Sequence, residues 1–491
     1  MNFVQWAFQK HLQEDKPAVI LEGKALSHGA LRTRAHAICA ELSEKGAKGN
    51  VALASENSPF FVESYFGIIA SGCACVPVNL SWDKQTIGEI LKTCETRVVF
   101  ASEKEAAHYA KEGFEVYSET AAHGAKNIYS LKGNAQPATV AEDYLAEIIF
   151  TSGSEGKPKG VMLSHGNLAA NAKSIIEYLS LKEGDVFLNV LPYHYCFGLS
   201  WLHTLLHVGG TVVLHNNFMF PGTTIDAIAK NNCTGFGGVP SNFQLLLRDK
   251  RFNEKTLPSI RFLAQAGGKL QDEYIHQLQA AFPTREIFIM YGQTEATARL
   301  SYLPAGMLSK KLGSIGKGIP GTTLSVVGDG GQPAAPGEVG EIVASGKNIM
   351  LGYWKDEEST REKLAGGVLH TGDLAKTDED GFIYVVGRQS NFLKSGGHKV
   401  FPYEIEAVVC RVPGIRAAAV VGAPDAILGE APVAFVEAEK SAQDAGGIIS
   451  FCRKNLPTYM VPKKVVFMDS LPKNERGKVS YSKIKEELVK C

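Results

Sequence analysis

The most constraining feature of the sequence is the alternation of short apolar runs, rich in β-branched residues, with longer amphipathic stretches. Strand-like runs lie at 51–53, 98–100, 147–151, 211–214 and 287–290, and helix-like stretches lie at 30–45 and 167–179. This alternation buries a parallel sheet between helices, so it predicts an α/β fold. Glycine-rich loops that directly follow the apolar runs are therefore expected at strand ends.

The secondary-structure signals in the sequence change twice towards the C-terminus. After about residue 321 it carries hairpin signals, at 328–331, 336–338 and 380–381. These predict a β-rich subdomain at about 321–389, within a large N-terminal domain at 1–389. A mixture of strand and helix signals resumes at Ser390 and predicts a small α+β domain at 390–491, which is long enough to fold separately.

Charge and composition exclude several functional classes. The chain has 51 Lys plus Arg and 51 Asp plus Glu, so it has no net charge that would attract nucleic acid. It lacks a signal-peptide pattern and a run of about 18 apolar residues, which predicts a cytoplasmic protein without a membrane span. Its nine cysteines lack zinc-site spacing and are interpreted as free thiols.

Residues 151–160 (TSGSEGKPKG) form the strongest single motif, between an apolar run and a helix-like stretch. Its glycines let backbone N–H groups approach an anion, its hydroxyls can donate hydrogen bonds, and its lysines supply positive charge. The spacing differs from the Walker loop, and Pro158 favours an extended Lys157. The motif predicts a phosphate-binding strap, with a solvated surface loop as the alternative.

Four further motifs are individually ambiguous. In residues 291–295 (YGQTE), an aromatic ring, a hydroxyl and a carboxylate suit a purine, a phosphate and Mg²⁺, although such a segment can be a plain turn. Asp373 in HTGD suits a ribose diol, and Arg388 suits phosphate or ribose, although each could be a turn residue or surface ion pair. Lys478 stands in a polar loop near the C-terminus, where a lysine is usually solvated.

Taken together, the motifs carry a specific resemblance. TSGSEGKPKG, LPYHYCFGL, YGQTE, GEIVASGKNIMLGYW, HTGD, GRQSNFLKSGGHKVFPYEIE and LPKNERGKV occur in this order over nearly the whole chain. In order and spacing the sequence resembles the acyl-adenylate-forming superfamily of acyl-CoA synthetases, peptide-synthetase adenylation domains and firefly luciferase. The resemblance implies a large domain of stacked α/β sheets and a small mobile C-terminal domain.

The resemblance also implies a reaction with two half-reactions. A carboxylate attacks the α-phosphorus of MgATP, giving acyl-AMP and pyrophosphate, and a thiol of CoA or phosphopantetheine then expels AMP. Lys478, Thr294 and Glu295 are the implied catalytic residues, with Glu295 as the ligand of Mg²⁺. The implied nucleotide contacts are Thr151, Ser152, Gly153, Ser154, Glu155, Gly156, Lys157, Lys159, Tyr291, Gly292, Thr294, Asp373, Arg388 and Lys478.

The C-terminal domain is implied to rotate between the two steps. Lys478 acts in adenylation only, where its ammonium offsets charge that develops at the α-phosphate. It must then leave so that a thiol can enter. The implied hinge is Ser390, where the family usually has Asp or Lys, and Gly396 and Gly397 are implied to line the thiol tunnel. A second departure is Glu155, at a strap position where Thr or Ser is common.

The acid substrate is less constrained. Residues 193–200 lack the aspartate that pairs with an α-ammonium in amino-acid-activating relatives. The expected acyl-pocket residues are His194, Phe197, Gly238, Val239, Gly267 and Gly268. His194 could equally be a packed core residue. His203 and His207, four residues apart, are interpreted as packed side chains rather than metal ligands.

The sequence therefore predicts a ligase for a small carboxylic acid without an α-amine, with CoA or a separate acyl or peptidyl carrier protein as acceptor. One alternative is a stand-alone enzyme that adenylates an amino acid or β-amino acid and loads a separate carrier protein. Another is a catalytically silent nucleotide-binding module, although such a module has no use for Lys478.

Overall fold

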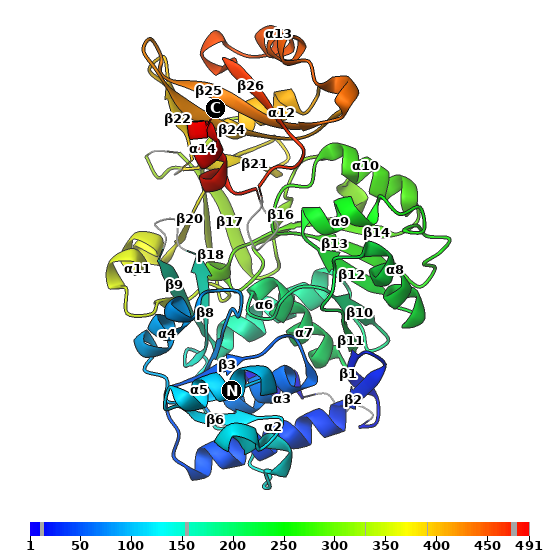
Figure 1. Ribbon diagram of the computed structural model, residues 1–491, viewed down its shortest axis with the longest axis vertical. Coiled ribbons are helices and arrows are strands. Elements are labelled where there is room, and N and C mark those ends of the chain that lie inside the picture. The colour runs from blue at the N-terminus through cyan, green and yellow to red at the C-terminus, as the bar shows by residue number, and fades with distance from the viewer. Residues whose placement is uncertain (10–13, 153–156, 329, 390, 473–478, 491) are drawn as a thin grey trace.

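The computed structural model describes residues 1–9, 14–152, 157–328, 330–389, 391–472 and 479–490. It contains two large sheets that share helices, a four-stranded antiparallel sheet, and a small sheet close to the C-terminus, at the top of Figure 1. The predicted α/β fold with β-rich and small C-terminal parts is thus confirmed. The exact domain boundaries at 389 and 390 stay a prediction.

The first large sheet has nine strands. Six central strands are parallel, and antiparallel strands close both edges. The four residues of β13 are all buried, as expected for a parallel sheet covered on both faces. The strands in order are β16 (Lys317–Gly318), β15 (Ser301–Leu303), β14 (Glu286–Tyr291), β13 (Phe262–Gln265), β12 (Gly235–Gly238), β10 (Val186–Asn189), β11 (Thr211–Leu214), β1 (Pro17–Leu21) and β2 (Lys24–Ser27).

The second large sheet has eight strands and a mixed edge. Its strands in order are β19 (Gly352–Tyr353), β9 (Pro158–Ser164), β8 (Leu145–Ser152), β4 (Ala74–Pro77), β3 (Asn50–Ala54), β5 (Val98–Ala101), β6 (Glu115–Ser118) and β7 (Lys126–Asn127). β8 and β9 pair antiparallel, with Thr151 opposite Lys159. The strap motif therefore spans a hairpin, because a further strand precedes the helix that the sequence placed directly after it.

Helices cover the faces of both large sheets. α6 and α7 lie between the two sheets in Figure 1, and residues from both sheets join one buried core. The Ser164 side chain caps α6 by accepting a hydrogen bond from the backbone N–H of Asn167. The helices are α1 (Phe3–Ala7), α2 (His28–Glu44), α3 (Pro59–Ala70), α4 (Lys84–Thr93), α5 (Glu103–Lys111), α6 (His165–Tyr178), α7 (Cys196–Val208), α8 (Pro221–Lys230), α9 (Pro240–Leu246), α10 (Asp272–Ala281), α11 (Glu357–Lys363), α12 (Pro402–Val409), α13 (Ala445–Asn455) and α14 (Tyr481–Lys490).

Two smaller sheets complete the molecule. The antiparallel sheet contains β17 (Thr322–Val327), β18 (Gly340–Gly346), β20 (Leu369–Thr377) and β21 (Ile383–Arg388). The last sheet contains β23 (His398–Val400), β22 (Leu393–Ser395), β25 (Gly429–Ala438), β24 (Ile415–Asp425) and β26 (Lys464–Met468), and has its own apolar core. Among the described residues, none of the helices is both long and apolar enough to cross a membrane.

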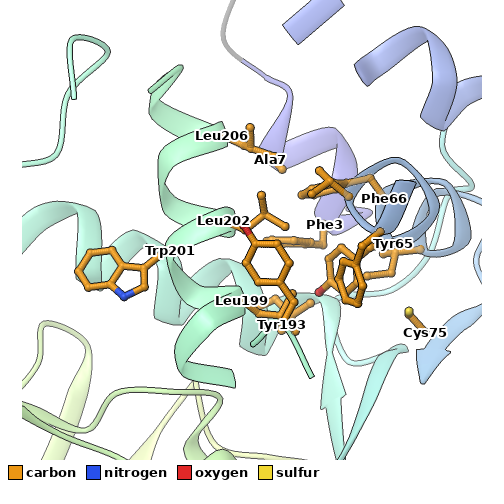
Figure 2. Close-up of a cluster of buried hydrophobic side chains, with 14 of the residues drawn as sticks. Phe3, Ala7, Tyr65, Phe66, Cys75, Tyr193, Leu199, Trp201, Leu202 and Leu206 are labelled. Atoms are coloured by element: carbon orange, nitrogen blue, oxygen red, sulfur yellow. The ribbon is translucent and has the colours of Figure 1, made fainter. Parts of the chain in front are cut away.

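A polar group is enclosed in the main core that Figure 2 shows around Tyr65 and α7. The Tyr65 hydroxyl donates to Glu147 Oε2 at 2.6 Å and lies 2.8 Å from His203 Nε2. His207 instead stacks on Trp6, with its Nδ1 2.9 Å from the Trp6 carbonyl oxygen. The two histidines thus pack against different partners, as the sequence predicted.

Replacing Glu147 with glutamine is expected to stabilise the protein above neutral pH. Burial raises the pKa of Glu147 to about 7, so the folded state binds a proton that the unfolded state has lost. This lowers the free energy of unfolding as the pH rises from the usual carboxyl pKa to about 7, by about 3–4 kcal/mol in total. Urea unfolding of both proteins should give equal stabilities near pH 4 and a more stable variant at pH 8. A pH-independent difference would contradict this assignment.

Candidate functional site

The last residues of β14 and β21 and the middle of β20 bring together three residues that the sequence predicted at the nucleotide. Tyr291 donates its hydroxyl hydrogen to Asp373 Oδ2 at 2.6 Å, and Arg388 Nε donates to Asp373 Oδ1 at 2.8 Å. Asp373 and Arg388 are cross-strand partners in the β20–β21 pair, which fixes their approach. The negative charge of Asp373 raises the pKa of Arg388, so the guanidinium stays positively charged. Tyr291, Asp373 and Arg388 are called the ribose cluster below.

A second cluster surrounds Glu295. The hydroxyl of Tyr353, on β19, donates to Glu295 Oε1 at 2.8 Å. Lys159 Nζ lies 5.5 Å from the centre of the Tyr353 ring and donates to Ser359 Oγ at 2.6 Å. Lys159 also lies 3.7 Å from Asp356 Oδ2. The end of the strap hairpin and the predicted Mg²⁺ ligand therefore meet at one tyrosine; Glu295, Tyr353 and Lys159 are called the phosphate cluster.

The sequence analysis missed a lysine between the two clusters. Lys363, at the end of α11, donates to the Thr371 carbonyl oxygen at 2.8 Å. Burial lowers the pKa of Lys363, while the negative charges of Glu295 and Asp373 oppose that shift. Both carboxylates therefore act on the same ammonium. The one available signal was a lysine ending a helix shortly before HTGD, and it could not be told from a solvated residue.

The other nucleotide candidates are placed as follows. Thr294 is buried, with its Oγ1 3.5 Å from Cys196 Sγ, and Thr151 is half-buried on β8. Lys157 is exposed at the start of the returning part of the hairpin. Ser152 ends β8. The four central strap residues Gly153, Ser154, Glu155 and Gly156 lie outside the described residues.

Several of the predicted pocket residues meet around Phe197. A Cβ built on Gly267 would lie 2.9 Å from Val239 Cγ1 and 3.9 Å from Phe197 Cδ1, so these three residues are neighbours. Gly268 approaches Pro240, and Gly238 approaches Asn242. His194 is half-buried and packs edge-on against Tyr195, at 4.3 Å between ring centres. The structure thus groups Phe197, Val239 and Gly267.

Only two of the candidate residues in the C-terminal part of the chain, Gly396 and Gly397, are among the described residues. Gly396 and Gly397 form the exposed turn between β22 and β23, with φ values of +58° and +81°. A Cβ on Gly396 would approach Leu428 and Tyr459, which belong to the same small sheet region. This region touches the larger part of the chain where Lys269 Nζ bonds to the Tyr403 hydroxyl and lies 4.3 Å from the centre of its ring. Lys478 and Ser390 lie outside the described residues.

Comparison with known proteins identifies the family. Residues 5–354 match the model of the AMP-binding enzyme, and residues 404–478 match that of the AMP-binding enzyme C-terminal domain. This chain belongs to the AMP-binding enzyme family. It is 32% identical over 472 residues to a feruloyl-CoA synthase from Amycolatopsis sp, with 93% of each chain covered.

Solved structures agree with the assignment of this chain to the AMP-binding enzyme family. ATP-bound MatB from Rhodopseudomonas palustris matches with a TM-score of 0.91 and 27% identity, over 99% of this chain and 98% of that chain. An o-succinylbenzoate CoA synthetase from Bacillus subtilis, in complex with its acyl-adenylate intermediate, matches with a TM-score of 0.86 and 26% identity, over 99% and 98%. The acyl-adenylate-forming resemblance inferred from the sequence is thereby confirmed.

The phosphate cluster of this AMP-binding enzyme suits a magnesium ion. Glu295 is half-buried and holds one carboxylate oxygen on Tyr353, while Oε2 has no recorded hydrogen bond within the described part of the chain. A fixed carboxylate with one oxygen left for coordination is a hard ligand of the kind that Mg²⁺ prefers. No group of three or more potential metal ligands occurs among the described residues. A single carboxylate together with substrate phosphates is a usual way to hold Mg²⁺.

Replacing Gly292 with alanine is expected to disrupt the nucleotide site of the AMP-binding enzyme. A Cβ at Gly292 would lie 2.0 Å from the Ala298 carbonyl oxygen and 2.8 Å from Arg299 Cα, which are backbone atoms that cannot move independently. Overpacking of this kind costs about 1–3 kcal/mol or more. The melting temperature should fall and ATP-dependent turnover should drop. Gly306→Ala is the control because its Cβ would meet nothing within 4 Å; equal effects at the two glycines would contradict the explanation.

Proposed function

We propose that this enzyme activates a small carboxylic acid with ATP as an acyl adenylate and transfers the acyl group to the thiol of CoA. One observation carries the proposal: the ribose cluster and the phosphate cluster, built from distant segments, lie close enough for Glu295 and Asp373 to act on the same Lys363 ammonium. Such a pair of clusters suits one nucleotide that extends from its ribose to its phosphates. The CoA-ligase names among the relatives support the acceptor.

In the first half-reaction, the ribose cluster holds the nucleotide. Asp373 accepts hydrogen bonds from the ribose hydroxyls, and Arg388 orients that carboxylate. The Tyr291 ring flanks the adenine while its hydroxyl remains anchored on Asp373. With ribose and adenine fixed, the α-phosphorus faces Thr294, and the acid carboxylate attacks it from the side of Phe197.

The phosphate cluster supports departure of pyrophosphate. Lys159 and the strap hydroxyls donate to the β- and γ-phosphates, and Glu295 holds the magnesium site. Mg²⁺, when bound there, neutralises charge on the phosphate oxygens. Tyr353 fixes the Glu295 carboxylate on one side and packs beside Lys159 on the other. The new bond joins the acid oxygen to the α-phosphorus, and the bond from that phosphorus to the pyrophosphate oxygen breaks.

In the second half-reaction, the thiolate sulfur attacks the acyl carbon and AMP leaves with the bonding electrons of the acyl–oxygen bond. Gly396 and Gly397 form an exposed turn without side chains, which suits close passage of a pantetheine arm. Rotation about Ser390 brings this turn to the acyl adenylate and withdraws Lys478. Transfer to a carrier protein in place of CoA, and the cytoplasmic location, stay predictions from the sequence.

A hydroxamate-trapping screen tests the function. Purified enzyme is incubated with ATP, Mg²⁺ and a panel of carboxylic acids, amino acids and β-amino acids, and productive acids are then tested with CoA and with a phosphopantetheinyl carrier protein. We expect acid-dependent hydroxamate formation and an acyl-CoA product with at least one acid lacking an α-amine. Activity restricted to amino acids would favour the carrier-loading alternative, and nucleotide binding without hydroxamate from any acid would indicate a silent module.

A further inference from the structure

A fully buried guanidinium lies beside the predicted acyl pocket. Arg299 precedes β15 and its side chain is almost completely inaccessible, with 1% of the residue exposed. Its Nε and Nη2 atoms are buried and have no hydrogen-bond partner in the described part of the chain. No carboxylate within that part forms an ion pair with it either. A buried arginine normally has its N–H groups paired, so these open donors require an explanation.

The surroundings compensate the charge of Arg299 only in part. Its Cζ lies 4.2 Å from the centre of the Phe197 ring and 5.6 Å from that of Trp201. Such cation–π contacts offset only part of the cost of burying an ion. Tyr178 shares a side-chain hydrogen bond with Arg299, but it supplies no negative charge, and burial raises its pKa further, to about 12. Positive charge therefore remains available to an anion.

The backbone of Arg299 is held in place, and its guanidinium lies against Phe197, one of the predicted acyl-pocket residues. Asn171 and Asn348 both donate their side-chain N–H groups to the Arg299 carbonyl oxygen, at 3.0 Å and 3.1 Å. Figure 2 shows Trp201 and Leu202 projecting from opposite sides of α7, and both side chains are buried in the main core. Arg299 lies close to the ring of Phe197, which borders Gly267, and Gly267 in turn borders Val239.

We propose that Arg299 binds a second anionic group of the acid substrate, so that the natural substrate is a dicarboxylic acid or another acid with a second, distal anion. The reacting carboxylate lies at Thr294, and the second anion accepts hydrogen bonds from Nε and Nη2 of Arg299. This inference rests on the proposed acid activation. It also explains why an α-ammonium is unsuited to this pocket, since Arg299 would repel it.

The test compares each dicarboxylic acid from malonic to suberic acid with its monoamide, which has the same shape and lacks the second charge. Pyrophosphate release is measured with wild-type enzyme and with Arg299→Met and Arg299→Lys. We expect at least one diacid to exceed its monoamide in kcat/KM, and Arg299→Met to lower that ratio about a hundredfold, mainly through KM, as for loss of a buried charge contact. Arg299→Lys should recover part of it.

The control variant is Arg416→Met, because Arg416 is an exposed arginine, 3.6 Å from Glu439. Its diacid-to-monoamide ratio should equal that of the wild type. The melting temperature of each variant separates misfolding from a change in selectivity.

Wild-type enzyme that prefers monoamides or simple monocarboxylic acids would overturn the inference while leaving the proposed function intact. An equal loss with every acid in Arg299→Met and Arg299→Lys would assign Arg299 a purely structural role. Failure of all acids would instead contradict the proposed function.

Discussion

Replacing Lys478 with alanine is expected to slow acyl-adenylate formation by about a hundredfold or more and to leave thioester formation from supplied acyl adenylate nearly unchanged. The reason is that a preorganised ammonium stabilises the charge that develops between the attacking carboxylate and the α-phosphate, and this charge is absent from the second step. The first step is measured by pyrophosphate release, and the second by thioester formation from synthetic acyl-AMP and CoA.

The matched control for this variant is Lys483→Ala, because Lys483 is an exposed lysine on α14 a few residues further along the chain. It should behave as the wild type in both steps. Loss of both half-reactions to the same extent in Lys478→Ala would contradict the division of roles between the two steps. An undiminished first step would remove Lys478 from adenylation altogether.

The second large effect is expected for Asp373→Ala. This change removes the carboxylate that accepts hydrogen bonds from both Tyr291 and Arg388, and it leaves the Arg388 cation without its partner. Hydrogen bonds to charged groups contribute about 1.5–3 kcal/mol each, so the KM for ATP should rise about tenfold to a hundredfold or more. The KM for the acid should change much less, because the proposed role of Asp373 is to bind the nucleotide and not the acid.

Two further variants make this prediction specific. Tyr291→Phe removes one hydrogen bond to Asp373 and retains the ring, so its effect on the KM for ATP should be smaller than that of Asp373→Ala. Asp380→Ala removes an exposed carboxylate from the neighbouring turn, where it pairs with Lys311, and should leave the KM for ATP unchanged. If Asp373→Ala raised the KM for the acid and not that for ATP, the ribose cluster would be misassigned.

Much of the fold followed from periodicity. The predicted strands at 98–100, 211–214 and 287–290 coincide with β5, β11 and β14, and the helices at 30–45 and 167–179 coincide with α2 and α6. These elements are long or fully buried, so their apolar pattern is strong. The hairpin return of the strap was not recognised, because β9 alternates irregularly between buried and half-buried residues and contains a proline and a glycine.

The candidate site divides in the same way. Tyr291, Asp373 and Arg388 were predicted from three short motifs, YGQTE, HTGD and the Gly–Arg pair, and the structure brings them into contact. Lys363 and Tyr353 were missed, although both contact predicted motifs. Tyr353 donates a hydrogen bond to Glu295, and Lys363 donates one to the Thr371 carbonyl oxygen in HTGD. Tyr353 lies in the GEIVASGKNIMLGYW motif but was given no role there, and nothing local distinguishes Lys363 from a surface residue. The contacts of both residues depend on which strands lie next to α11 and β19.

The sequence by itself determined the class of fold, the family and the chemical type of each nucleotide contact, because these depend on local periodicity and on short motifs with fixed spacing. Only the tertiary structure decided which side chains share a partner: that Glu295 and Lys159 meet at Tyr353, and that Arg299 is buried against Phe197 without a carboxylate among the described residues. The segments that bury Arg299 are distant from it in the chain. The cost of burying its charge therefore depends on tertiary packing, which the sequence pattern does not show.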